Sequence, residues 1–143
     1  MSPSKRLQPV QRVAESREQK AARHLGVSRQ ALQAEEVKLN QLKEYHQEYL
    51  ERFESAARKG ISASQLQEYR AFLGKLEEAI RHQEDVVKVS KIDHTTHKND
   101  WRLQHTRTQA LNKAVSRFKK LEEAKQERNE QKESDDRNQR TPE

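Results

Sequence analysis

The stretch Lys59-Gly60-Ile61-Ser62-Ala63-Ser64-Gln65 combines a signal that ends a helix with a signal that begins one. Gly60 can adopt the left-handed backbone conformation that closes a helix, because it has no Cβ to clash. Ser62 can accept a hydrogen bond from a free backbone N–H of a new helix, and Gln65 can reach back to the Ser62 N–H, which completes a capping box. The stretch therefore predicts that one long helix ends here, the chain reverses, and a second long helix packs back against the first.

Both flanks of this turn carry seam residues at alternating spacings of three and four. Ten of the fifteen seam positions before the turn are apolar, and so are ten of the sixteen after it. A seven-residue repeat held this long predicts a left-handed coiled coil. The seam positions are Leu7, Gln11, Ala14, Glu18, Ala21, Leu25, Ser28, Leu32, Glu35, Leu39, Leu42, His46, Tyr49, Phe53 and Ala56, then Leu66, Tyr69, Leu73, Leu76, Ile80, Gln83, Val87, Ser90, His94, His97, Trp101, Gln104, Thr108, Leu111, Val115 and Phe118.

We therefore predict an all-α fold, in which two long helices form an antiparallel coiled-coil hairpin over residues 1–133. The first helix is expected over about 5–58, the turn at 59–62 and the second helix over about 63–132. Residue i then faces about residue 121 − i, so that Phe53 meets Tyr69. Because residues 119–143 are almost wholly polar and charged, we expect a disordered tail over 134–143.

Composition argues against an enzyme. The 143 residues are 36% charged and only 31% hydrophobic, which leaves no sizeable core in which a pocket could form. The three glycines are isolated, so a phosphate-binding loop is absent, and we expect no catalytic residues and no cofactor. His94 and His97 have a spacing that two metal ligands can use, but both fall on the seam, so we predict a polar seam and no metal site.

The sequence also bears on location. There is no cysteine, which excludes disulfides and thiolate metal sites. The N-terminus leads into no apolar segment of a signal peptide, and nothing approaches the roughly 18 apolar residues of a membrane span. We expect a cytoplasmic protein without direct membrane insertion.

The net charge of +6 is unevenly spread along the chain. Residues 1–30 hold seven basic and two acidic side chains, and residues 95–118 hold five basic and one acidic. In a hairpin these two segments lie side by side, so the end that carries the chain termini is strongly basic. Such a surface could bind phosphates of a nucleic acid or an acidic protein patch. No aromatic residues alternate with the charges for base stacking.

One edge of the predicted hairpin is unusually apolar near the turn. Tyr45, Phe72, Ala79 and Val86 all occupy the g position of the heptad, which flanks the seam. These side chains either widen the seam or form a docking surface. A two-helix protein has no third element to cover them, which favours a docking surface.

The sequence resembles the FliJ family of flagellar type III export components over roughly residues 10–118. The resemblance is carried, in order, by residues 21–26 (AARHLG), 34–36 (AEE), 45–49 (YHQEY), 60–62 (GIS), 69–80 (YRAFLGKLEEAI) and 99–102 (NDWR). The order and spacing of these segments, with the turn at Gly60, make the resemblance specific.

This resemblance implies a non-enzymatic stalk that binds the hexameric export ATPase through the end with both termini, contacts the cytoplasmic part of the membrane export gate, and assists export chaperones. Its expected location is the inner face of the cell membrane at the flagellar base. The implied gate-binding residues are Leu42, Tyr45, Tyr49, Phe72, Leu76 and Ala79. We predict that the ATPase is bound by Arg12, Arg17, Arg23, Lys113 and Arg117 of the basic end. The alternatives are the stalk of a virulence-type secretion system and a nucleic-acid-binding helical hairpin.

Overall fold

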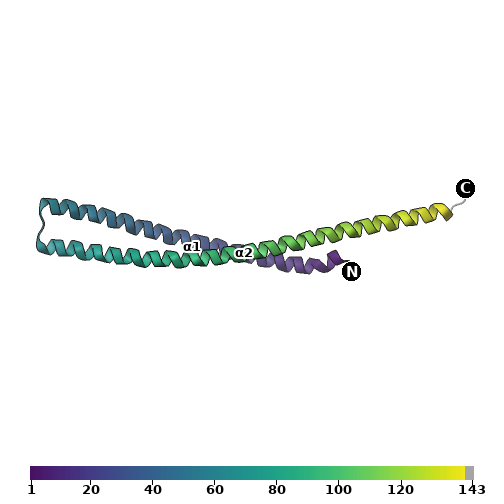
Figure 1. Ribbon diagram of the computed structural model, residues 1–143, viewed down its shortest axis with the longest axis horizontal. Coiled ribbons are helices and arrows are strands. Elements are labelled where there is room, and N and C mark those ends of the chain that lie inside the picture. Colours follow the sequence, from purple (N-terminus) through teal and green to yellow (C-terminus); the bar gives the residue numbers. More distant parts are fainter. Residues whose placement is uncertain (141–143) are drawn as a thin grey trace. The chain divides into compact units, whose positions relative to one another are not determined.

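The computed structural model describes residues 1–140 and consists of two long helices (Figure 1). Helix α1 spans Pro3–Lys59 and helix α2 spans Ala63–Arg140. No strand occurs among the described residues. The predicted all-α class, with one turn between two long helices, is confirmed.

The turn has the geometry that its residues predict. Gly60 has a φ of 94°, and its N–H donates to the Ala57 carbonyl at 3.2 Å, which closes α1. The Ser62 N–H donates to Gln65 Oε1 at 3.1 Å, and the Gln65 N–H donates to Ser62 Oγ at 3.1 Å. These two reciprocal bonds are the capping box, and they satisfy donors that would otherwise be free at the start of α2.

The predicted seam is the buried stripe of both helices. All fifteen seam positions on α1 are buried or half-buried, as are fifteen of the sixteen on α2. The exception is Phe118, which is 37% exposed. In the predicted register Phe118 faces the first residues of α1, where the partner helix begins, so little of α1 is available to cover its ring.

The helix pair divides into two units, which are described separately. The turn unit comprises Arg23–Asn99. Within it the ring centroids of Phe53 and Tyr69 lie 5.4 Å apart, as the register predicts. The rings of His24 and His97, at the far end of this unit, meet edge to face at 5.7 Å. The antiparallel register therefore holds across the turn unit.

The terminal unit comprises residues 1–22 and the part of α2 from Asp100 onward. The Ser4 N–H and hydroxyl both donate to the Glu122 carboxylate, at 3.0 and 2.7 Å. These bonds lower the pKa of Glu122 below its ordinary value of 4.5, because they favour the ionised form. A side chain of α2 thus caps a backbone N–H in the first turn of α1.

Further along the terminal unit, Glu18 and His105 face one another across the seam and are hydrogen-bonded. This hydrogen bond is the main reason that the pKa of Glu18 lies below 4.5. Gln11 Nε2 also donates to Asn112 Oδ1 at 2.9 Å. Polar pairs of this kind fix the register of a coiled coil at some cost in stability.

The C-terminal end of α2 differs from the prediction. We expected a disordered tail from residue 134, but α2 continues to Arg140, and residues 141–143 lie outside the described residues. The extension beyond Glu122 consists mainly of Lys, Glu, Gln and Arg, which are good helix formers. Side-chain hydrogen bonds one turn apart, from Gln126 to Glu130 and from Gln131 to Asp135, add local support. Helix propensity therefore outweighs the lack of a packing partner.

Candidate protein-docking surfaces

Five aromatic rings form a continuous cluster beside the turn. Tyr49 lies at its centre, with ring centroids 4.4 Å from Phe72, 5.4 Å from Tyr69 and 6.5 Å from Tyr45. Tyr45 meets Phe72 edge to face at 5.9 Å. Each of these contacts is in the range where aromatic pairs attract one another. The cluster ties the two helices together and presents rings at one edge of the pair.

The structure places the six predicted gate-binding residues on facing stretches of α1 and α2 in the turn unit, with different exposure. Leu76 is buried at 7%, and Leu42, Tyr49, Phe72 and Ala79 are half-buried. Tyr45 is the most accessible of the six, at 44% exposed. We call these six residues the aromatic edge. Three of its members, Leu42, Tyr49 and Leu76, are seam residues, and Tyr45 contributes mainly to the surface.

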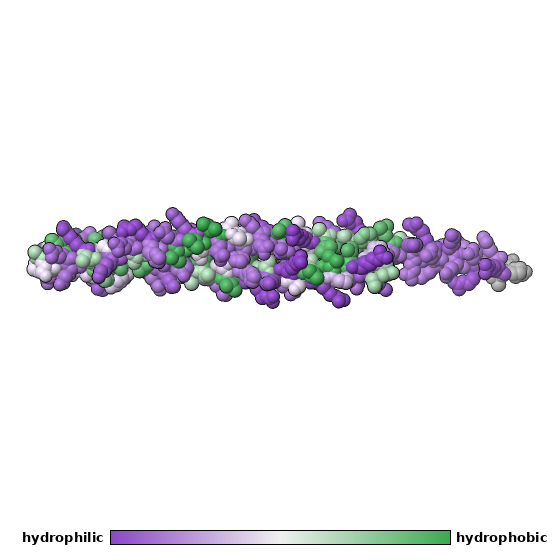
Figure 2. All heavy atoms as spheres, turned by 90° about the horizontal axis from the view of Figure 1, so that it is seen from below, coloured by the Kyte–Doolittle hydropathy of each residue, from purple (hydrophilic) through white to green (hydrophobic). Residues whose placement is uncertain are grey.

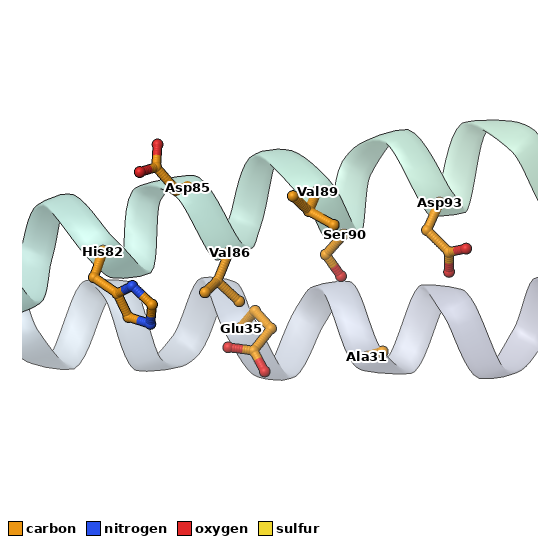
Figure 3. Close-up of a pocket in the computed structure, with 8 residues that line it drawn as sticks. All are labelled: Ala31, Glu35, His82, Asp85, Val86, Val89, Ser90 and Asp93. Atoms are coloured by element: carbon orange, nitrogen blue, oxygen red, sulfur yellow. The ribbon is translucent and has the colours of Figure 1, made fainter.

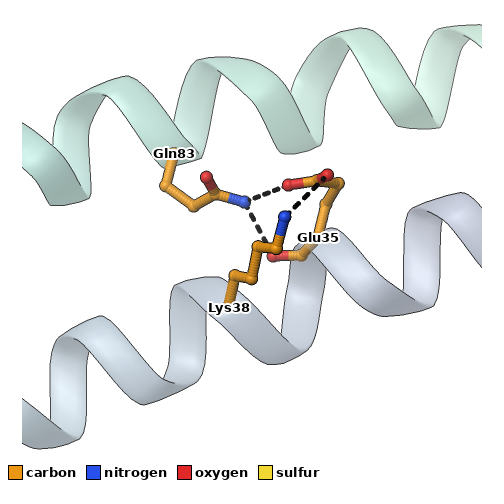
Figure 4. A network of polar contacts seen from close by, with 3 residues as sticks. All are labelled: Glu35, Lys38 and Gln83. Carbon is orange, nitrogen blue, oxygen red and sulfur yellow. Dashed lines mark hydrogen bonds and ion pairs between the residues drawn. The ribbon is translucent and has the colours of Figure 1, made fainter.

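A polar contact crosses the seam close to the aromatic edge (Figure 4). Gln83 is 9% exposed, and its side-chain amide donates to the Glu35 carbonyl at 3.0 Å and to the Glu35 carboxylate. Lys38 lies one turn further along α1, with its Nζ 3.7 Å from the same carboxylate. Gln83 is therefore committed to joining the helices, whereas Lys38 keeps an exposed side chain at the edge.

The five predicted ATPase-binding residues are all exposed. Four of them, Arg12, Arg17, Lys113 and Arg117, belong to the terminal unit, two on each helix, and Arg23 is the first residue of the turn unit. None of the five makes an ion pair or hydrogen bond with the residues described. Their charges are therefore available to a partner.

One of these five residues, Arg17, borders an apolar groove in the terminal unit, which we call the basic groove. It measures about 290 Å³, and Arg17 and Arg107 stand beside a floor that includes Val10, Val13 and Leu111. Val10 and Val13 are about half exposed, at 48% and 50%. Figure 2 shows hydrophobic side chains open to the surface on one face of the molecule. The basic groove fits an apolar segment that also carries negative charge.

Sequence reasoning missed the apolar floor of this groove, although a signal was present. Val10, Arg17 and Arg107 occupy the same g positions of the heptad as Tyr45 and Phe72 of the aromatic edge. Following those g rows along each helix would have brought Val10, Arg17 and Arg107 together, whereas Val13 and Leu111 of the floor occupy other heptad positions.

The histidines offer no metal centre within residues 1–140, where no group of three or more His, Cys, Asp or Glu is arranged to hold an ion. His97 instead lies 3.4 Å from the Asp93 carboxylate one turn away. In the same part of the chain, neither helix contains a segment apolar enough to cross a lipid bilayer.

The family model described as "Flagellar FliJ protein" matches residues 3–142, which is nearly the whole chain. No curated protein and no solved structure matches the chain. The family match extends the resemblance of residues 10–118 toward both ends of the chain.

Proposed function

Because the chain belongs to the flagellar FliJ family, whose members are non-catalytic components of the flagellar export apparatus, we propose that it is the stalk that connects the export ATPase to the membrane export gate. Its proposed location is the cytoplasmic face of the membrane at the flagellar base. The observation that carries this proposal is that each of the two units bears an exposed surface, and that the two surfaces differ in chemistry. One is basic and the other is aromatic.

The terminal unit is the part that we propose to bind the hexameric ATPase and to promote its ring assembly and hydrolysis. Arg12, Arg17, Lys113 and Arg117 are exposed and unpaired among the described residues, so an acidic surface on the ATPase would meet charges that need not first break other contacts. The apolar floor of the basic groove would add contact area that charge alone does not supply.

The test of this step is the hydrolysis rate and oligomer size of the purified ATPase, with and without the chain. Changing Arg12, Arg17, Lys113 and Arg117 to Glu should abolish the stimulation of both. The matched control changes four exposed basic residues of the turn unit to Glu, namely Lys43, Arg52, Arg58 and Arg70, which alters the net charge by the same amount. Equal loss in the control would reject the basic end as the binding site. Wild-type protein that leaves the ATPase unchanged but shifts a nucleic acid in a gel would favour the nucleic-acid alternative.

The aromatic edge is the part that we propose to dock on the cytoplasmic domain of the export gate. Aromatic side chains that are only partly covered are typical anchors of protein interfaces, and Tyr45 and Phe72 meet at the surface of this edge. The double variant Tyr45→Ala/Phe72→Ala should lose gate binding, measured by titration calorimetry, and should reduce swimming motility. Retained binding and motility would rule out this edge.

We also propose that the chain assists export chaperones. This proposal rests on membership of the family, and no surface is assigned to it. The measurement is co-purification of export chaperones with the wild-type chain, with the quadruple Glu variant of the terminal unit, and with the double variant Tyr45→Ala/Phe72→Ala. Loss of a chaperone from one variant alone would identify the surface that it uses.

A further inference from the structure

The turn unit contains another apolar groove, which shares no residue with the aromatic edge or with the basic groove. It measures about 570 Å³, and we call it the acidic groove (Figure 3). Its apolar surface comes from Ala31 on α1 and from Val86 and Val89 on α2. Val89 is 67% exposed and Val86 is half-buried, so a contiguous apolar strip faces solvent here.

The charged residues of this groove all have one sign. Glu35, Asp85 and Asp93 line it together with His82 and Ser90, and no Lys or Arg does. This is notable in a chain with a net charge of +6. Figure 3 shows Val86, Ser90 and Asp93 pointing from α2 toward α1, whereas Asp85 points away from α1.

The three carboxylates differ in how far they are already engaged. Glu35 accepts from Gln83 and lies near Lys38, and Asp93 lies near His97. Asp85 is exposed and makes no hydrogen bond or ion pair with the described residues. The groove therefore offers at least one uncommitted negative charge beside exposed valine side chains.

We propose that the acidic groove docks a basic amphipathic helix of a partner protein. Charge complementarity selects Lys and Arg for the side chains that meet Asp85 and Asp93. The small side chain of Ala31 and the branched side chains of Val86 and Val89 suit an apolar ridge that packs between two helices. The basic groove has the opposite sign, since Arg17 and Arg107 line it and no acidic residue does. The two grooves therefore select partners of opposite charge.

This inference goes beyond the proposed stalk function, because it assigns neither the ATPase nor the gate to the groove. It can stand if either of those assignments fails. Binding here requires neither Tyr45 nor Arg17.

The test uses two synthetic 18-residue amphipathic helical peptides that share one apolar face, with Lys at the polar positions of one peptide and Glu at those of the other. Binding to the full chain is followed by fluorescence anisotropy at low salt. The Lys peptide should bind the wild-type chain at least about tenfold more tightly than it binds the variant Asp85→Lys/Asp93→Lys, because two attractions become repulsions. Its binding should also weaken as salt is raised, since exposed charges are screened.

A second pair of variants separates the groove from general stickiness. Val89→Asn removes exposed apolar surface without adding charge, and should weaken the binding of the Lys peptide about threefold or more. The matched control Val13→Asn makes the same change in the basic groove and should leave the Lys peptide unaffected. Both residues are exposed, and thermal melts followed by circular dichroism check that each variant is folded.

Three results would overturn the proposal: failure of the Lys peptide to bind the wild-type chain, binding of the Lys peptide that survives the double charge reversal, or equal weakening of Lys-peptide binding by Val13→Asn and Val89→Asn. The Glu peptide is expected to bind the basic groove, so Asp85→Lys/Asp93→Lys should not weaken its binding. Tyr45→Ala should still bind the Lys peptide, which separates this surface from the aromatic edge.

Discussion

Tyr45→Ala and Tyr49→Ala should have clearly different effects on stability, although both remove a ring from the same cluster. Tyr49 contacts three other rings and lies on the seam, whereas Tyr45 contacts two and is 44% exposed. If Tyr45 serves mainly as a docking residue, its removal should cost the isolated chain little. Tyr49 should behave as part of the core.

The magnitudes follow from the ring contacts and the burial. Truncating a large buried ring costs about 3–5 kcal/mol, and the half-buried Tyr49 should fall near the lower limit, at about 3 kcal/mol. Tyr45 loses two longer ring contacts, each worth about 0.5 kcal/mol, so that about 1 kcal/mol is expected. For a chain of this length the corresponding falls in Tm are about 9 °C and about 3 °C.

The assay is thermal and urea unfolding followed by circular dichroism at 222 nm, with Tyr49→Phe as the control. No hydrogen bond involves the Tyr49 hydroxyl among the described residues, so this control should match the wild type. If Tyr45→Ala destabilised the chain as much as Tyr49→Ala, Tyr45 would be a structural residue. A docking role for Tyr45 would then be rejected.

Three further predictions concern the turn and the polar contacts of the terminal unit. Gly60→Ala should destabilise the chain by about 1–2 kcal/mol, because Ala is strained at a φ of 94°. Gly26→Ala, in an open position inside α1, should instead stabilise the chain by about 1 kcal/mol. Urea titrations of both variants check these opposite signs. Glu18 has a lowered pKa, so its contribution to stability is present above pH 4.5 and disappears as the pH falls through the folded-state pKa. The variant Glu18→Gln should therefore lose less stability on acidification than the wild type does. Equal acid sensitivity of the two proteins in urea titrations would contradict this. Glu122→Gln should speed amide hydrogen exchange in the first turn of α1, as measured by mass spectrometry, while the exposed neighbour variant Glu123→Gln should not.

Much of the fold follows from the sequence, because a heptad repeat and a capped turn are local patterns. The capping box and the left-handed Gly60 were predicted from seven residues. The seam positions were predicted from spacing alone, and Phe118 departs from the prediction only because its partner helix begins there. A side chain at a seam position points toward the partner helix, so its burial is determined by the register of the pair.

The surfaces were harder to predict. Neither groove was identified, because a groove depends on side chains of different heptad positions from both helices, such as Val13 with Arg107 or Ala31 with Val89. The bond from Ser4 to Glu122 was also missed, since it joins residues outside the predicted seam at the end of the pair. Seam spacing predicts which side chains turn inward, but not which polar groups find one another at the ends and edges.

The unpaired extension of α2 gives the chain two kinds of unfolding. Residues 125–140 are exposed on all sides, and no helix of the terminal unit packs against them, since α1 begins opposite Glu122. Their helical order then obeys helix–coil statistics, in which each turn adds or loses a few tenths of a kcal/mol and fraying proceeds gradually from the end. On warming, ellipticity from this segment should decline as a sloping baseline, well before the paired helices separate in a sigmoidal transition. Calorimetry should register the second event and almost nothing of the first.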